Sequence, residues 1–283
     1  MALQFKPLAR GKDWDIEWLL RNGQESICFT FNNSTFIDSA ALDAIRQHRA
    51  WHFYCSELWS GADLSVFAPV ADIVEKIALP ARKTVPIIGL DSLINLREIN
   101  ISGHVDAIDF TKFANLRSLM VNEQCRGGNW PLCASLDTLS VNVTLPNLTK
   151  LAALKNLRVL SCGRGLKSFQ GISGLPSLTE LRIAGTHLNS LETLGNLPNL
   201  EFLLLNLMPK LQTLKGIEGL TALTTLDVTQ CGSLRDVTSI STLTTLKKLE
   251  LYFCPHIKTL VNIKLPADCK IDFQPNGKVS DGF

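Results

Sequence analysis

The sequence lacks the features that mark a secreted, membrane-bound or nucleic-acid-binding protein. Its 28 Lys and Arg residues nearly balance its 26 Asp and Glu residues, so no excess of positive charge indicates nucleic-acid binding. No apolar run approaches the roughly 20 residues of a membrane span, and the N-terminus lacks the apolar core of a signal peptide. We therefore expect a cytoplasmic protein that binds neither nucleic acid nor membrane.

Cysteine is sparse, with eight residues in 283 and no Cys-x-x-Cys pair. Disulfide scaffolds and zinc ribbons require more cysteine or closer spacing. Cys254-Pro-His256 offers two metal ligands, but no second pair lies at a suitable spacing. We expect reduced thiols and no metal or other cofactor.

Catalytic signatures are also missing. The chain has no Walker A sequence, no Gly-x-Ser-x-Gly and no His-Glu-x-x-His. Cys162, followed by Gly-Arg-Gly, resembles a nucleophile or phosphate loop, but its place in an apolar strand pattern favours burial. His104, Asp106 and Asp109 share one return loop, for which a solvated loop is favoured over an acid–base site. We expect no enzymatic activity.

Leucine is what the sequence has in excess, and its leucines recur at a fixed spacing. The pattern Leu-x-x-Leu-x-Leu, with other apolar residues at some positions, occurs nine times at steps of 20 to 23 residues. The copies span residues 74–79, 96–101, 116–121, 136–141, 157–162, 178–183, 200–205, 223–228 and 246–251. A tenth, degenerate copy includes Ile271 and Phe273.

These copies resemble the leucine-rich repeat family. The segments between them, such as FQGISGLPSL at 169–178, LETLGNLPNL at 191–200 and LKGIEGLTAL at 214–223, resemble the short repeats of bacterial internalins and protein-phosphatase regulatory subunits. The resemblance covers roughly residues 70–273. It implies an α/β fold in which each repeat contributes one strand of a parallel, concave sheet and a short helical or extended return on the convex side.

Elementary geometry supports the same architecture. The second and third apolar positions of each copy alternate with polar residues, which places their side chains on one face of a short strand. Leucines three apart in the returns, as at Leu191, Leu194 and Leu197, suit a 3₁₀-like segment. Because no single turn can bury its apolar face alone, neighbouring turns must stack into a continuous core.

One position departs from the family pattern. The ninth position of the repeat, usually Asn, is Cys231 and Cys254 in two copies and Thr144 and Thr186 in two others. Thiols and hydroxyls can partly replace the Asn hydrogen bonds to the backbone. The remaining copies have His104, Gln124, Gly165 and Met208. Gly165 and Met208 cannot replace them, so we expect those two turns to be looser or water-filled.

The first 70 residues differ from the repeats and are predicted to form an N-terminal α/β cap. Residues 26–31 and 51–55 are typical of strands, and Asp38 is a typical N-cap for a helix over residues 39–48. Four of the five tryptophans lie in this region and are expected to cover the first repeat: Trp14, Trp18, Trp51 and Trp59.

The predicted organisation is therefore a cap over residues 1–70, a solenoid of nine to ten turns over 71–273 and a flexible tail over 274–283. If the chain has no catalytic site, its function must depend on a surface. The outward strand positions are small and neutral in the N-terminal half of the solenoid, and large and charged in the C-terminal half.

The C-terminal half supplies the candidate binding residues. Aromatic and aliphatic side chains next to a column of carboxylates suit a partner with a basic surface. The candidates are Arg182, Phe202, Leu204, Asp227, Glu250, Tyr252, Phe253 and Asp272. Lys248 and Lys270 flank the carboxylates and are expected to neutralise part of their charge. An ordinary protein surface, on which isolated apolar residues are normal, is the alternative interpretation.

We expect a non-enzymatic protein-binding module. Within that class, the hypothesis is a bacterial immunity protein that neutralises a toxin through the concave face. A phosphatase-regulator-like scaffold and a secreted effector are the alternatives. The sequence does not specify the partner's identity or the oligomeric state.

Overall fold

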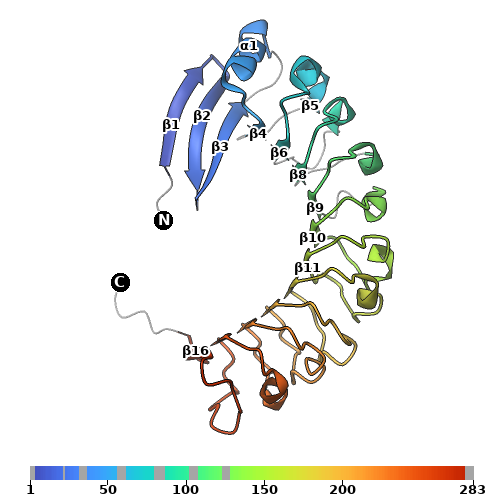
Figure 1. The fold of residues 1–283 in the computed structure, drawn as a ribbon, viewed down its shortest axis with the longest axis vertical. Coiled ribbons are helices and arrows are strands. Elements are labelled where there is room, and N and C mark those ends of the chain that lie inside the picture. The colour runs from blue at the N-terminus through green and yellow to red at the C-terminus, as the bar shows by residue number, and fades with distance from the viewer. Residues whose placement is uncertain are drawn as a thin grey trace. The chain divides into compact units, whose positions relative to one another are not determined.

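The computed structural model describes residues 4–21, 23–31, 37–55, 62–79, 87–101, 108–122 and 128–277. Trp59, His104, Asp106 and Gln124 lie outside these residues. The chain divides into two compact units, Met1–Leu136 and Asp137–Phe283, here called unit 1 and unit 2. The strands of each unit are shown in Figure 1.

Unit 1 begins with three antiparallel strands and continues with parallel ones. The strands in sheet order are β1 (Gln4–Arg10), β2 (Trp14–Arg21), β3 (Gln24–Phe31), β4 (His52–Cys55), β6 (Lys76–Leu79), β8 (Glu98–Ile101) and β9 (Ser118–Asn122). β1 to β3 pair antiparallel, and each later pair from β3–β4 to β8–β9 is parallel. Two short strands, β5 (Ala62–Asp63) and β7 (Ile87–Ile88), form a separate parallel pair.

One α-helix, α1 (Ser39–His48), connects β3 to β4, as the sequence predicts. The Asp38 carboxylate accepts a hydrogen bond from the Ala41 backbone N–H at 2.9 Å, which satisfies a donor that a helix N-terminus leaves free. Arg49 ends the helix in the left-handed conformation, with φ of 51°. The predicted strands over 26–31 and 51–55 are present as β3 and β4, whereas β1 and β2 were not predicted.

Phenylalanine fills the core at the start of unit 1. Phe29 and Phe67 are fully buried, and each packs against the ring of the equally buried Phe53, with centroids 5.1 and 4.8 Å from it. The expectation that the tryptophans cover the first repeat stays a prediction. Trp14 is buried next to Phe29, but Trp18 and Trp51 are half-buried.

Unit 2 is a continuous run of parallel strands. They are β10 (Thr138–Asn142), β11 (Val159–Cys162), β12 (Glu180–Ala184), β13 (Phe202–Asn206), β14 (Thr225–Thr229), β15 (Lys248–Tyr252) and β16 (Lys270–Gln274). In Figure 1 the strands of unit 2 lie on one side and the returns on the other. All ten strands predicted by the repeat, from β6 to β16 without β7, are confirmed.

Leucine columns form the core of unit 2. Leu181, Leu203, Leu226 and Leu249 stand opposite one another on adjacent strands, and all are fully buried. Their pairing places identical side chains one above the next, which is how stacked turns share one core.

The returns confirm the 3₁₀ prediction. In unit 1 they contain the short 3₁₀ helices η2 (Leu64–Val70), η3 (Leu90–Ser92), η4 (Phe110–Lys112) and η6 (Trp130–Leu132), and in unit 2 η7 (Thr149–Leu151), η8 (Ile172–Gly174) and η9 (Thr238–Thr242). The return that starts at Leu191 is less regular, yet the Leu194 N–H still bonds to the Leu191 carbonyl at 2.8 Å. These i to i+3 bonds require the three-residue spacing of the leucines.

The ninth repeat position behaves as predicted where it carries a donor. The Thr186 hydroxyl donates to the Leu166 carbonyl at 2.8 Å, and the buried Cys231 thiol to the Leu205 carbonyl at 3.9 Å. The looser turns expected at Met208 and Gly165 are not seen. Met208 is fully buried, and the Thr144 methyl group stands 2.5 Å from where a Cβ on Gly165 would lie. Side chains therefore occupy the space at both positions, and the water-filled alternative stays a prediction.

Candidate functional site

The parallel register brings the predicted residues of unit 2 into three exposed columns across β12 to β16. One column holds Glu180, Phe202, Thr225, Lys248 and Lys270; the next holds Arg182, Leu204, Asp227, Glu250 and Asp272; the third holds Ala184, Asn206, Thr229, Tyr252 and Gln274. We call these three columns the strand face. Seven of the eight candidate residues lie on it, and Phe253 does not.

Arg182 is held over an aromatic ring at one end of the strand face. Its guanidinium carbon lies 4.9 Å from the centroid of the Phe202 ring, within the range of a cation–π interaction. The same guanidinium pairs with the Glu180 carboxylate. Arg182 therefore covers part of the Phe202 ring. A partner that docks here would contact the guanidinium, which lies over the ring.

Leu204 and Asp227 stand side by side in the middle column. Leu204 is half-exposed although the strand has buried leucines on both sides of it. Partial burial raises the pKa of Asp227, while the Thr229 hydroxyl, which donates to this carboxylate at 2.7 Å, opposes the rise. The register therefore sets an apolar side chain next to a carboxyl group.

The other two carboxylates of the middle column already have partners. Lys248 Nζ lies 2.7 Å from a Glu250 oxygen, which confirms the expected partial neutralisation. Asp272 accepts hydrogen bonds from the Tyr252 hydroxyl and, at 2.7 Å, from Gln274 Nε2. The bond to Asp272 raises the pKa of Tyr252 to about 12. The carboxylate column is therefore a preorganised surface rather than a set of mobile charges.

Phe253 occupies the turn after β15 instead of the strand face. Its φ is 52°, in the left-handed region, and its side chain is 48% exposed. Sequence analysis missed its two counterparts on neighbouring turns, Leu207 and Gln230, with φ of 53° and 56°. The signal that could have found them is Gly185, a glycine at the same repeat position one turn earlier, with φ of 67°.

The corresponding outward positions on β6, β8 and β9 of unit 1 carry fewer charged and aromatic side chains than those of unit 2. Ala78 and Asn100 face each other across β6 and β8, and Met120 on β9 is 39% exposed. One ion pair, between Lys76 and Glu98 at 2.8 Å, lies beside them. No aromatic residue accompanies these side chains on β6, β8 and β9.

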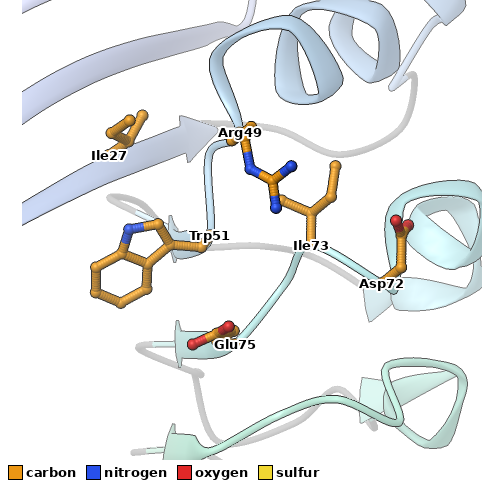
Figure 2. Close-up of a pocket in the computed structure, with 6 residues that line it drawn as sticks. All are labelled: Ile27, Arg49, Trp51, Asp72, Ile73 and Glu75. Atoms are coloured by element: carbon orange, nitrogen blue, oxygen red, sulfur yellow. The ribbon is translucent and has the colours of Figure 1, made fainter.

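Unit 1 also contains a cavity of about 390 Å³. Figure 2 shows the lining side chains, with the guanidinium of Arg49 beside Ile73, and with Trp51 and Glu75 just before β4 and β6. Glu75 also faces Arg97, whose Nε is 3.6 Å away. The cavity presents the Trp51 ring, the Arg49 guanidinium and two carboxylates, Asp72 and Glu75.

The residues considered for catalysis or metal binding do not form a site in the described parts of the chain. Cys162 is 6% exposed, and burial raises the pKa of its thiol to about 12, which disfavours the reactive thiolate. Asp109 caps η4 by accepting a bond from the Thr111 N–H at 3.1 Å. No group of three His, Cys, Asp or Glu residues among the described positions is arranged to hold a metal ion. Nor does any described helix have the length and apolarity to cross a membrane.

Comparison with known proteins identifies the fold. No protein-family model matches the sequence, and no curated protein matches it. An internalin of Listeria monocytogenes (inlF) has a similar structure, with a TM-score of 0.56 and 18% identity over 81% of this chain and 69% of that one. The chain therefore has a leucine-rich repeat fold similar to that of this internalin.

Two further solved structures match over much of their length. A leucine-rich repeat protein of Leptospira interrogans aligns over 87% of this chain and 89% of its own, at 17% identity and a TM-score of 0.45. The leucine-rich repeat domain of the type III effector XopL aligns over 88% of this chain and 77% of its own, at 21% identity and a TM-score of 0.39.

Proposed function

We propose that the chain is a non-enzymatic module that binds a basic protein through the strand face of unit 2. The observation that carries the proposal is the register that sets Leu204 beside Asp227, Glu250 and Asp272 in one column. Apolar anchors next to ordered carboxylates supply both the desolvated contact and the charge complementarity that specific interfaces use.

The proposed face is preorganised, which lowers the cost of binding. The Tyr252–Asp272–Gln274 hydrogen bonds and the Lys248–Glu250 ion pair fix side chains that would otherwise lose rotamer freedom in a complex. Lys248 also reduces the net negative charge, so the face favours a moderately basic partner surface over a highly charged polycation.

A double variant, Leu204→Glu with Asp227→Lys, tests the proposal. It replaces the apolar anchor and inverts the neighbouring charge at two half-exposed positions. Affinity purification from the organism that encodes the chain, quantified by mass spectrometry, should show one partner reduced by about tenfold or more. The matched control is Ser140→Glu with Ser161→Lys, which changes the same outward position on β10 and β11. If the wild type and the double variant capture the partner equally, the strand face is not the binding site.

Within this class, we propose a neutralising role: the partner is a bacterial toxin that this chain holds inactive in the cytoplasm. A charged concave face suits an enzyme target, and the described cysteines are free thiols. The captured partner should be an enzyme that the wild-type chain inhibits at a one-to-one ratio and the double variant does not. A partner that keeps its activity in the complex would favour the phosphatase-regulator-like scaffold instead. A partner found only in a host cell would favour the secreted effector.

A further inference from the structure

A row of turn residues borders the strand face of unit 2. Gly185, Leu207, Gln230 and Phe253 each follow the last residue of a strand, and each has a positive φ between 52° and 67°. Each donates its backbone N–H to the carbonyl of the next rung; the Leu207 N–H, for instance, lies 3.1 Å from the Thr229 oxygen. The stacking of the turns thus imposes the left-handed conformation on whatever residue occupies this position.

Only glycine adopts this conformation without strain, as Gly185 does. Leu207 and Phe253 adopt it under strain, and they gain little burial in return because they are 50% and 48% exposed. Of the four described non-glycine residues with positive φ, three lie in this row. The stacked hydrogen bonds account for this backbone conformation, but they do not account for the exposure of two large apolar side chains that adopt it.

A shallow, open depression of about 490 Å³, here called the cavity, lies in the same row. Phe253, Pro255 and Pro275 give it apolar walls, and Gln230, Gly232 and Asn276 complete it without a charge. The turn over residues 274–277, closed by a 3.0 Å bond from the Gly277 N–H to the Gln274 carbonyl, supports one side of the ring. A Cβ on Gly277 would lie 2.2 Å from the Phe253 ring, so only glycine allows this close contact.

Two buried amide oxygens next to this row have no hydrogen-bond partner: Asn206 Oδ1 and Gln274 Oε1. They are the only buried side-chain polar atoms in the described part of the chain that lack one. They belong to the residues immediately before Leu207 and Pro275. Unsatisfied acceptors are costly, so their position adds to the strain of the same edge.

We infer that this turn edge, formed by Leu207, Gln230, Phe253, Pro255 and Pro275, is a second contact area for the partner bound on the strand face. The inference rests on the proposed function. The occupant is a segment of a basic protein that inserts one aromatic or long aliphatic side chain into the cavity and lays Lys or Arg over the adjoining carboxylates. Tyr252, which precedes Phe253 and bonds to Asp272, connects the cavity to the carboxylate column.

Asparagine variants separate a binding role from a packing role. Asn tolerates the left-handed conformation, so Leu207→Asn and Phe253→Asn should keep the melting temperature unchanged or raise it. Each should weaken affinity for the partner captured by the strand face, by about tenfold for Phe253→Asn. Val261→Asn is the matched control, because Val261 is 87% exposed in unit 2 but lies outside the row. A marked fall in melting temperature, with affinity unchanged, would assign the side chains to packing and overturn the inference.

The same variants distinguish failure of the inference from failure of the proposed function. If Leu204→Glu with Asp227→Lys abolishes capture and Phe253→Asn does not change it, the strand face is retained and the turn edge is rejected. If Phe253→Asn abolishes capture and the strand-face variant does not, the turn edge is retained as a contact and the strand face is rejected.

Short peptides test the cavity without the natural partner. With the isotopically labelled full chain, the peptide Lys-Lys-Phe-Lys-Lys should shift the NMR amide signals of Gln230, Gly232 and Asn276 in a saturable way. Lys-Lys-Ala-Lys-Lys lacks the ring, and Glu-Glu-Phe-Glu-Glu has the opposite charge, so neither should do so. Equal shifts with the acidic and basic peptides would reject the basic occupant, and no shift with any peptide would reject the cavity as a binding site.

Discussion

The start of unit 1 and the repeats of unit 2 fill their cores with different side chains. Unit 1 packs phenylalanine rings such as Phe29, Phe53 and Phe67 beneath antiparallel strands and a helix, whereas unit 2 repeats leucine at equivalent positions such as Leu203 and Leu226. Identical rungs require side chains that stack on copies of themselves, and leucine fits that spacing. The irregular space where a helix meets a mixed sheet has no such repeat, and aromatic rings fill it.

The outward strand positions also differ between the two units, here with the larger side chains in unit 2. On β6 and β8 of unit 1 the outward positions carry the small Ala78 and Asn100, while β13 and β14 of unit 2 carry Phe202, Leu204 and Asp227. The buried pattern is therefore nearly constant along the repeats, and the exposed positions are where they diverge. Packing constrains the buried residues, whereas the exposed residues can vary to suit a binding partner.

The largest effect is expected in the aromatic core. Phe53→Ala should lower the free energy of unfolding by about 3–5 kcal/mol, because Phe53 is fully buried between two other rings and the cavity cannot collapse. Chemical denaturation of the full chain measures it. A loss below about 1 kcal/mol would show that the rings do not form a packed core.

The leucine core should respond somewhat less. Leu226→Ala is expected to cost about 2–5 kcal/mol, since it removes a fully buried rung of the shared core. Leu204→Ala, on the exposed side of the adjacent strand, is the matched control and should cost less than about 1 kcal/mol. Equal losses at the two positions would contradict the assignment of inward and outward faces.

Acid should destabilise unit 1 through His52. Burial, with a smaller contribution from Lys76, lowers the pKa of His52 from 6.5 to about 4. The unfolded chain then binds a proton more readily than the folded one, so stability falls as pH drops from 6.5 towards 4, by at most about 1.4 kcal/mol per pH unit. His52→Gln should flatten this slope in denaturation curves measured across that range. An unchanged slope would show that other groups cause the acid sensitivity.

The smallest effect concerns the turns of unit 2. Thr186→Val keeps the shape of a buried side chain but removes its bond to the Leu166 carbonyl, and should cost about 1–2 kcal/mol. Thr179→Val removes a comparable bond, to the Arg158 carbonyl, at an exposed site where water replaces it, and should cost less than about 0.5 kcal/mol. If the order were reversed, the buried hydroxyl would not be stabilising the turn.

Much of this fold could be predicted because repeat spacing determines both strand position and register. Leu139, Leu160 and Leu181 pair as their places in the repeat require, and the outward columns follow from the same register. The helix over 39–48 could be predicted from its cap at Asp38. The predicted domain boundaries and tail stay predictions.

The rest could not be predicted, for physical reasons. β1 (Gln4–Arg10) is largely exposed and carries no apolar alternation, so nothing in its sequence distinguishes it from a loop. The left-handed turns at Leu207, Gln230 and Phe253 were missed because none of these residue types favours a positive φ, and the one sequence signal for them is Gly185 at the same repeat position. The stacked hydrogen bonds impose that conformation, and they exist only in the assembled fold.

Photo-crosslinking tests the account's central claim, that the strand face of unit 2 is where the partner binds, most directly. A photoreactive amino acid is placed at Leu204 in unit 2 or at Met120 in unit 1, which hold the same outward position of their repeats. Illumination of cells of the encoding organism should join a basic protein to the chain from position 204 and not from position 120. Crosslinks from position 120 alone would contradict the assignment.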